Sequence, residues 1–403
     1  MGENDVGRRI REVRAWRGLS LRATAELTGI THGYLAQLER GEKPVKNRQL
    51  LEALARTLRV SPVEFLADAY GPPVEPATEA FTAMAELADL LGGWWVGEVP
   101  DAPTRPLAGV LADLRRFHEA RNSPGPKVAG DYPTQIGTLS RLIRDLLAAA
   151  AEPAHEHRVL APLLTAYHVA GSIAMRLRIP GLPSLAADRM QQVADRLDDP
   201  VWQAVAAWGR AQFLSGVNRA RQYELAVAAA DMAPADRPET RGMANLTAAM
   251  AAATQGDADL AETHLAEAAA IAERVEPDVS PWPAGVMQFG RTNVGIFRVT
   301  VGVELGHGAR VAEVAEGVRL ETISRGRQAS FWLDYGRGLL TDRGRRDEGL
   351  SALLRAEQLA PQQVHTNVFA REAVAELQRS SRRDASGREV RGLAWRMGLA
   401  PTG

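Results

Sequence analysis

Residues 18 to 41, GLSLRATAELTGITHGYLAQLERG, constrain the fold of this chain more than any other stretch. Ser20 can cap the N-terminus of a short helix, and Thr31 can cap a second helix that runs to about Arg40. Gly29 stands between them, where the chain must turn sharply and a side chain would clash. The spacing therefore predicts two helices that cross at a fixed angle.

Apolar side chains at helical spacing hold this crossing together. They are Leu19, Ala25, Ile30, Leu35 and Leu38. The outer face of the second helix then consists of His32, Gly33, Ala36 and Gln37. Reading the major groove of DNA requires side chains near the start of a helix that do not pack in the protein core.

This stretch resembles the helix-turn-helix of phage-repressor and Cro-like (XRE-type) bacterial regulators. The matching residues are Gly18-Leu19-Ser20, Ala25, Gly29-Ile30-Thr31 and Tyr34-Leu35-x-Gln37-Leu38-Glu39-Arg40-Gly41. Two positions depart from the family. Thr24 replaces the usual aliphatic residue and predicts slightly poorer packing, and Gly33 removes a side chain that often reads a base.

We predict DNA contacts from residues of the two helices and the loop after them. They are Ser20, Leu21, Arg22, Thr31, His32, Gly33, Tyr34, Gln37, Arg40, Lys43 and Lys46. Lys43 and Lys46 are expected to contact phosphates, which position a protein without reading sequence. For Tyr34, packing beside the turn is favoured over a base contact.

The charge of the chain is asymmetric. The net charge is −1, but residues 1 to 59 carry +5 and the remainder carries −6. A basic patch of this kind is the electrostatic footprint of phosphate binding. A solvated charged face is the alternative, and the excess by itself favours neither.

Length and composition limit the classes of protein that remain. A chain of 403 residues with 45% hydrophobic content predicts two or more cores. There are no cysteines, so disulfides and cysteine zinc sites are excluded. The most apolar stretch, around residues 146 to 151, is too short to span a bilayer. We therefore expect a cytoplasmic protein without membrane contact.

Residues 1 to 70 are expected to form a five-helix DNA-binding domain. Val6, Ile10 and Val13 mark its first helix, and Leu51, Leu54 and Leu58 mark its fourth. Ser61-Pro62-Val63-Glu64 has the cap, proline and glutamate that open a fifth. The proline-rich residues 71 to 77, GPPVEPA, predict a stiff linker. Residues 78 to 133 are interpreted as a helical connecting region, with a helix from Thr78 to Leu91.

Residues 134 to 403 predict an array of helical hairpins. Turn glycines recur at a roughly regular interval, namely Gly181, Gly216, Gly256, Gly306 and Gly344. Near the end, Trp332-x-x-Tyr335-Gly336-x-x-Leu339, followed by Gly349, Leu353, Ala356 and Pro361, resembles a tetratricopeptide repeat. The predicted fold is all-α, with the helix-turn-helix domain followed by a right-handed tetratricopeptide-like solenoid.

The whole chain resembles actinobacterial regulators that join this helix-turn-helix to a tetratricopeptide sensor domain. The resemblance implies a transcriptional regulator that binds double-stranded operator DNA and whose solenoid binds a small-molecule or peptide effector. A DNA-tethered adaptor that recruits a protein partner is the alternative. We also expect a homodimer, because one such domain reads only a few base pairs.

An enzyme is not expected. His155-Glu156-His157 places two possible metal ligands on opposite sides of a helix, whereas helical zinc sites use histidines four residues apart. We therefore predict no catalytic residue, no metal site and no cofactor.

The effector is expected between residues 288 to 298 and a helix beginning at Trp332. An asparagine within a helix contributes little to the fold and has a donor and an acceptor to offer. In the regulators that the chain resembles, groove asparagines bind the ligand. The predicted effector-binding residues are Asn245, Arg291, Asn293, Arg298, Trp332 and Tyr335. The competing interpretation is that the asparagines tie neighbouring repeats together.

Overall fold

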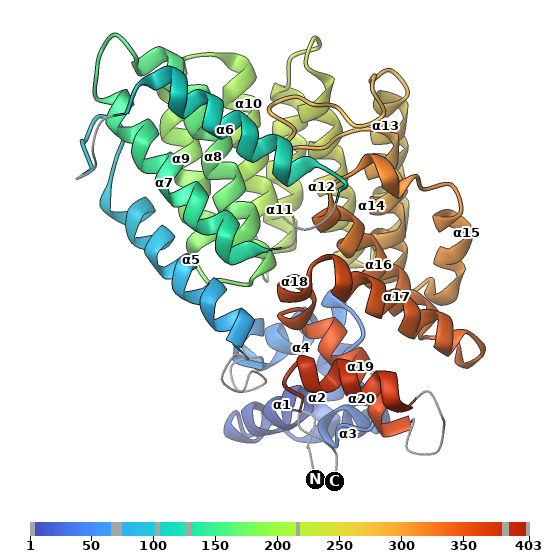
Figure 1. Cartoon of the computed structure of the whole chain (residues 1–403). Helices are drawn as coiled ribbons and strands as arrows, with labels where there is room; N and C mark the ends of the chain where they lie inside the picture. The colour runs from blue at the N-terminus through green and yellow to red at the C-terminus, as the bar shows by residue number, and fades with distance from the viewer. Residues whose placement is uncertain are drawn as a thin grey trace.

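A computed structural model describes residues 5–65, 75–100, 105–125, 131–214, 218–380 and 387–399. Throughout these ranges the secondary structure is helical and contains no strand, which confirms the all-α prediction (Figure 1). No helix within them is long and apolar enough to cross a membrane.

Four α-helices and one 3-10 turn form the N-terminal domain. They are α1 (Asp5–Trp16), α2 (Leu21–Thr28), α3 (His32–Glu39), α4 (Arg48–Leu58) and η1 (Pro62–Phe65). The predicted fifth α-helix is wrong within the described residues, because the amide of Glu64 bonds the carbonyl of Ser61, three residues back. Its predicted continuation beyond residue 65 lies outside the described residues.

The next helix begins earlier than the sequence indicated. Helix α5 spans Glu75–Gly93, so residues 75–77 of the predicted linker are helical, and the predicted start at Thr78 is wrong. Proline is tolerated in the first turn of a helix, because the amide hydrogens there have no partner within the helix. Residues 71–74, the rest of the predicted linker, lie outside the described residues.

Paired helices fill most of the remaining chain and stack side by side (Figure 1). The long helices are α6 (Leu107–Asn122), α7 (Tyr132–Ala150), α8 (Glu156–Arg176), α9 (Leu182–Leu197), α10 (Pro200–Phe213), α11 (Arg219–Met232), α12 (Pro238–Gln255), α13 (Ala258–Ala272), α14 (Arg291–Glu304), α16 (Arg325–Leu339) and α17 (Arg346–Leu359). The short ones are η2 (Gly308–Arg310), α15 (Val311–Ala315), η3 (Leu320–Thr322), η4 (Arg343–Arg345) and α18 (Pro361–His365). We call residues 107–365 the helical array.

Small residues act in the array as the sequence indicated. Gly256 ends α12 with a left-handed φ of 84°, and Gly306 follows α14 with a φ of 78°. In the last hairpin, α16 and α17 approach so closely that a Cβ added at Gly336 would lie 2.9 Å from the carbonyl oxygen of Gly349. Helix α16 begins at Arg325, however, and not at Trp332. Gly216 lies outside the described residues.

The last two helices return to the N-terminal domain. They are α19 (Val368–Ser380) and α20 (Gly387–Arg396), and Figure 1 shows them beside α1–α3. Val368 and Phe369 join the same buried apolar cluster as Ile10 and Leu35. The start of α19 and the N-terminal domain therefore share one core.

Candidate nucleic-acid interface

The turn between α2 and α3 has the capping that the sequence predicts. Ser20 Oγ accepts a hydrogen bond from the amide of Ala23 at 3.1 Å, and Thr31 Oγ1 accepts one from the amide of Tyr34 at 3.2 Å. Gly29 takes a φ of 76°. Both helix starts are thus held by side chains that immediately precede them.

The core beneath α3 is tightly packed. Ala25, Leu35 and Leu38 are buried, as expected. Thr24 is also fully buried, and its hydroxyl finds no hydrogen-bond partner among the described residues. Poorer packing was predicted at Thr24; the hydroxyl there is desolvated without a compensating bond.

A buried ion pair joins the last turn of α1 to the end of α3. The guanidinium of Arg14 donates to both carboxylate oxygens of Glu39, at 2.6 and 2.8 Å. The hydrogen bond to Glu39 raises the pKa of Arg14. This bidentate contact fixes α3 relative to the rest of the domain.

The outer face of α3 remains accessible at its start. His32 and Gly33 are exposed, whereas Ala36 and Gln37 are half-buried. Tyr34 is half-buried, and burial followed by the charge of Glu376 on α19 raises its pKa. Tyr34 therefore packs against the core of the domain, near the charge of Glu376.

The other predicted DNA contacts surround this face. Arg22 and Lys46 are exposed, Lys43 is half-buried, and Leu21 packs against the domain core. The exposed guanidinium of Arg40 binds the carboxylate of Glu42 at 2.6 and 2.9 Å. The structure thus places the eleven predicted residues on and around α2, α3 and the following loop.

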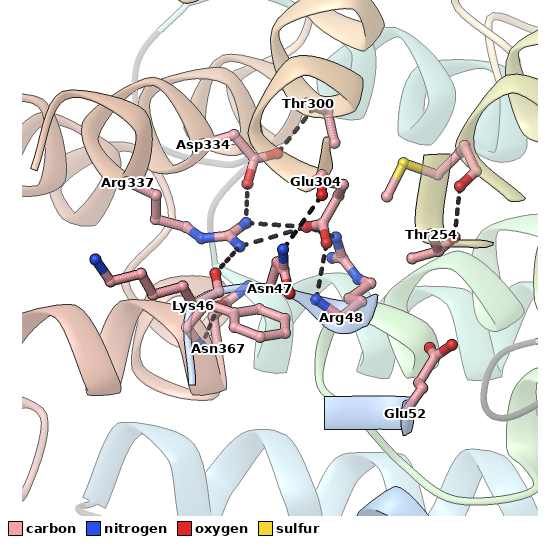
Figure 2. A network of polar contacts seen from close by, with 12 residues as sticks. Lys46, Asn47, Arg48, Glu52, Thr254, Thr300, Glu304, Asp334, Arg337 and Asn367 are labelled. Atoms are coloured by element: carbon pink, nitrogen blue, oxygen red, sulfur yellow. Dashed lines mark hydrogen bonds and ion pairs between the residues drawn. The ribbon is translucent and has the colours of Figure 1, made fainter. Parts of the chain in front are cut away.

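A charged cluster that the sequence did not indicate attaches this loop to the array. The carboxylate of Glu304, at the end of α14, is fully buried between Arg48 and Arg337 (Figure 2). Glu304 Oε2 accepts from the amide of Arg48 at 2.8 Å, and Oε1 accepts from its guanidinium at 2.5 Å. Arg337 also donates to Asp334 at 2.7 Å and to the carbonyl of Lys46 at 2.9 Å. We call Arg48, Glu304, Asp334 and Arg337 the docking cluster.

The electrostatics of the docking cluster are balanced. Burial alone would raise the pKa of Glu304, but the charges of Arg48 and Arg337 outweigh it and hold the pKa below its ordinary value. Phe369 lies under both guanidiniums, 5.4 Å from Arg48 and 4.4 Å from Arg337. Two positive and two negative groups therefore share one desolvated site.

Two further contacts hold the same side of the domain. Glu52 on α4 binds the guanidinium of Arg219 on α11 at 2.7 Å, and both side chains are largely buried. The amide of Val45 donates to Glu372 on α19 at 3.4 Å. The N-terminal domain thus contacts the array and the C-terminal helices through residues 44–52.

The polar members of the predicted effector-binding set each bind a different partner in the array. Asn245 bonds His264 on the paired helix at 2.8 Å and the carbonyl of Arg241 on its own helix at 2.9 Å. Arg298 faces Glu262 at 3.9 Å. Asn245 thus ties α12 to α13, as the competing interpretation proposed.

The remaining members of that set face other parts of the array. Arg291 binds Glu276 at 2.8 Å, and Tyr335 stacks on Phe331 and donates to Glu348 at 3.0 Å. Trp332 packs edge-on against the same Phe331 ring, at 5.3 Å between ring centroids. Phe331, Trp332 and Tyr335 all lie on α16, so aromatic packing within one helix accounts for both aromatic members of the set.

Asn293 is placed differently from its prediction. It lies in the first turn of α14 and not mid-helix, since residues 285–290 precede the helix. Its side chain is 1% exposed, and Oδ1 accepts two bonds from Arg327 on α16, at 3.0 and 2.6 Å. This contact joins α14 to α16.

Comparison with known proteins agrees with the geometry of the N-terminal domain. A model of the family described as a helix-turn-helix domain matches residues 5–67, so this part of the chain is a helix-turn-helix domain. Among curated proteins, none matches the sequence. A solved structure with detectable similarity is the apo form of the competence regulator ComR from Streptococcus vestibularis. It is 11% identical, with 98% of this chain and 99% of that chain covered and a TM-score of 0.25.

Proposed function

We propose that the chain is a sequence-specific transcriptional regulator whose helical array binds a small-molecule or peptide effector and thereby alters operator binding. The accessible start of α3, on a capped helix-turn-helix with a basic excess, supports the proposal. In this proposal the array binds the effector, and the N-terminal domain binds the operator DNA.

The two ends of the DNA-binding surface have different roles in this proposal. Gln37 can bond an adenine edge with two hydrogen bonds, and His32 can reach a base or a phosphate. Lys43 and Lys46 contact phosphates, as do the helix starts at Ser20 and Thr31. Since Gly33 offers no side chain, few bases are read directly.

The docking cluster connects the helical array directly to the N-terminal domain. Glu304 ends α14 and binds the first residue of α4, so a shift of α14 changes the position of the N-terminal domain. Glu376 also lies close enough to Tyr34 on α3 to influence its pKa. An effector that favours one arrangement of α14 over another therefore changes access to DNA.

The alternative function is a DNA-tethered adaptor that recruits a protein partner without a diffusible ligand. A ligand that co-purifies with the chain favours the regulator, and a stable protein partner favours the adaptor. A homodimer is expected because one helix-turn-helix domain reads only a few base pairs, and it stays a prediction for both functions.

Enrichment of genomic fragments by the purified chain tests the function. We expect the bound fragments to share one short motif, because a helix in the major groove discriminates between base pairs. Bound fragments without a common motif would contradict sequence-specific regulation.

Two substitutions separate base reading from phosphate contact. Gln37→Ala should weaken binding to the preferred site by about 1–3 kcal/mol and relax specificity at one position. Lys43→Ala should weaken all sequences equally and reduce the salt slope by about 1. Binding titrations on operator variants at several salt concentrations measure both, and an unchanged base preference in Gln37→Ala would show that Gln37 does not read a base.

A further inference from the structure

Three arginines from distant parts of the chain meet inside the array. Arg121 lies in the last turn of α6, Arg176 ends α8, and Arg327 lies in the first turn of α16. Among the described residues, none of the three forms an ion pair with a carboxylate. All three are partly accessible by surface area.

Each guanidinium instead donates to a neutral amide oxygen. The bonds run from Arg121 to Gln135 at 2.8 Å, from Arg176 to Gln363 at 3.0 Å, and from Arg327 to Asn293 at 3.0 and 2.6 Å. An amide oxygen accepts a hydrogen bond but has no net charge, so these bonds do not neutralise the positive charges.

Further contacts draw this cluster together. Gln363 Oε1 also accepts from the hydroxyl of Tyr132 at 3.1 Å, which joins α7 to the group. A Cβ added at Gly326 would lie 2.8 Å from Nη1 of Arg176. Arg176 thus lies against the first turn of α16, one residue before Arg327.

The charges influence one another. Burial, and then the charge of Arg176, lower the pKa of Arg121 to about 10 and that of Arg327 to about 9. Asp334 acts on Arg327 in the opposite direction, but its carboxylate already binds Arg337 and Thr300. The three guanidiniums therefore create a region of strong positive potential.

Other arginines in this chain contrast with the cluster. Arg14 binds Glu39, Arg219 binds Glu52, and Arg337 lies between Asp334 and Glu304. Charges drawn partly out of water are normally paired, because an unpaired one loses hydration without compensation. An arginine cluster without carboxylates is the arrangement expected where a ligand supplies the negative charge.

We propose that Arg121, Arg176 and Arg327 bind an anionic effector with at least two negative charges on phosphate or carboxylate oxygens. The planar guanidinium fork matches both kinds of oxyanion. The inference rests on the proposed function, since it names the chemistry of the effector.

The position of the cluster explains how such an anion acts on the DNA-binding domain. Asn293 and Glu304 lie at opposite ends of α14, and Arg327 and Arg337 lie at opposite ends of α16. The anion site is therefore at one end of two helices whose other ends form the docking cluster. A ligand that pulls α16 toward α6 and α8 moves Asp334 and Arg337, the two members of the docking cluster on α16.

Thermal unfolding of the full chain tests this inference with inorganic pyrophosphate and citrate as probes, at an ionic strength held constant with sodium chloride. We expect a saturable rise in Tm with at least one probe. A response to pyrophosphate alone indicates a phosphorylated effector, and a response to citrate alone a carboxylate one. The absence of a saturable response to either would overturn the proposal.

Arg176→Gln provides a second, independent readout. It should raise the Tm without probe, because it removes repulsion, and weaken probe binding about ten- to a hundredfold. Arg355→Gln, at an exposed position on α17, is the matched control and should leave the response unchanged. An Arg176→Gln protein that responds like wild type would overturn the site.

The two proposals fail in different ways. Genomic-fragment enrichment without a common motif counts against the regulator, whatever the Tm shows. A shared motif without any response to the probes counts against the anion site alone.

Discussion

Replacing Glu304 with glutamine is expected to weaken the contact between the N-terminal domain and the array by about 3–5 kcal/mol. Glutamine keeps the shape of the side chain and removes its charge. Arg48 is then left without its carboxylate, and Arg337 keeps only Asp334. Because Glu304 is 0% exposed, water cannot reach the site to solvate the guanidiniums that lose their partner.

Hydrogen exchange at residues 44–52 and thermal unfolding together measure this effect. The amide of Arg48, which donates to Glu304, should exchange faster in Glu304→Gln. Glu348→Gln is the matched control, because Glu348 is exposed and its ion pair with Arg345 contributes little. Equal exchange and equal Tm in the two variants would show that the docking cluster does not hold the domain.

The pH dependence of the docking contact follows from the same residue. The pKa of Glu304 is lowered in the folded chain, so its contribution is present above its ordinary value of 4.5. It is lost as the pH falls through the lowered folded-state pKa. Docking through Glu304 should therefore persist at neutral pH and fail only in acid.

The sequence predicted what depends on neighbouring residues. Ser20, Gly29 and Thr31 act within three or four positions of themselves, so their types and spacing were enough to locate α2, the turn and α3. Gly336 and Gly349 belong to one hairpin, and their small size indicated a close approach. Local capping and packing signals are readable because the partner lies nearby in the chain.

The docking cluster could not be predicted, because its members are far apart in sequence. Arg48 and Glu304 are separated by 256 positions, and each looks like an ordinary charged residue near a helix end. The same holds for Arg176 and Gln363, 187 positions apart. A charge that is solvated in one arrangement is buried and paired in another, and only tertiary packing decides between them.

The partners of the predicted effector residues could not be predicted for a related reason. The sequence leaves two interpretations for Asn245 and Asn293, either a ligand-binding amide or an amide that ties neighbouring repeats together. His264 satisfies the first amide and Arg327 engages the second, from helices whose orientation the sequence did not provide. The partner of Asn293 is Arg327, which binds no carboxylate among the described residues. The arginine is therefore the better candidate for a ligand contact than the asparagine.

Gly7→Ala is expected to destabilise the N-terminal domain by about 1–3 kcal/mol or more and to abolish tight DNA binding. A Cβ added at Gly7 would lie 2.0 Å from the carbonyl oxygen of Leu38, at the crossing of α1 and α3. That oxygen belongs to the backbone and cannot rotate away like a side chain. Helix α3 must therefore move, and the bidentate contact between Arg14 and Glu39 is strained with it.

Gly33→Ala is the matched control, because it makes the same change in the same domain with nothing within 4 Å of the added Cβ. It should stabilise α3 by about 0.5–1 kcal/mol, since alanine is the better helix former. Hydrogen exchange of α1 and α3 compares the two variants, and binding of Gly7→Ala to the enriched DNA motif is compared with that of the wild type. If Gly7→Ala matched Gly33→Ala in protection and kept wild-type affinity, the close crossing of α1 and α3 would not be what positions α3.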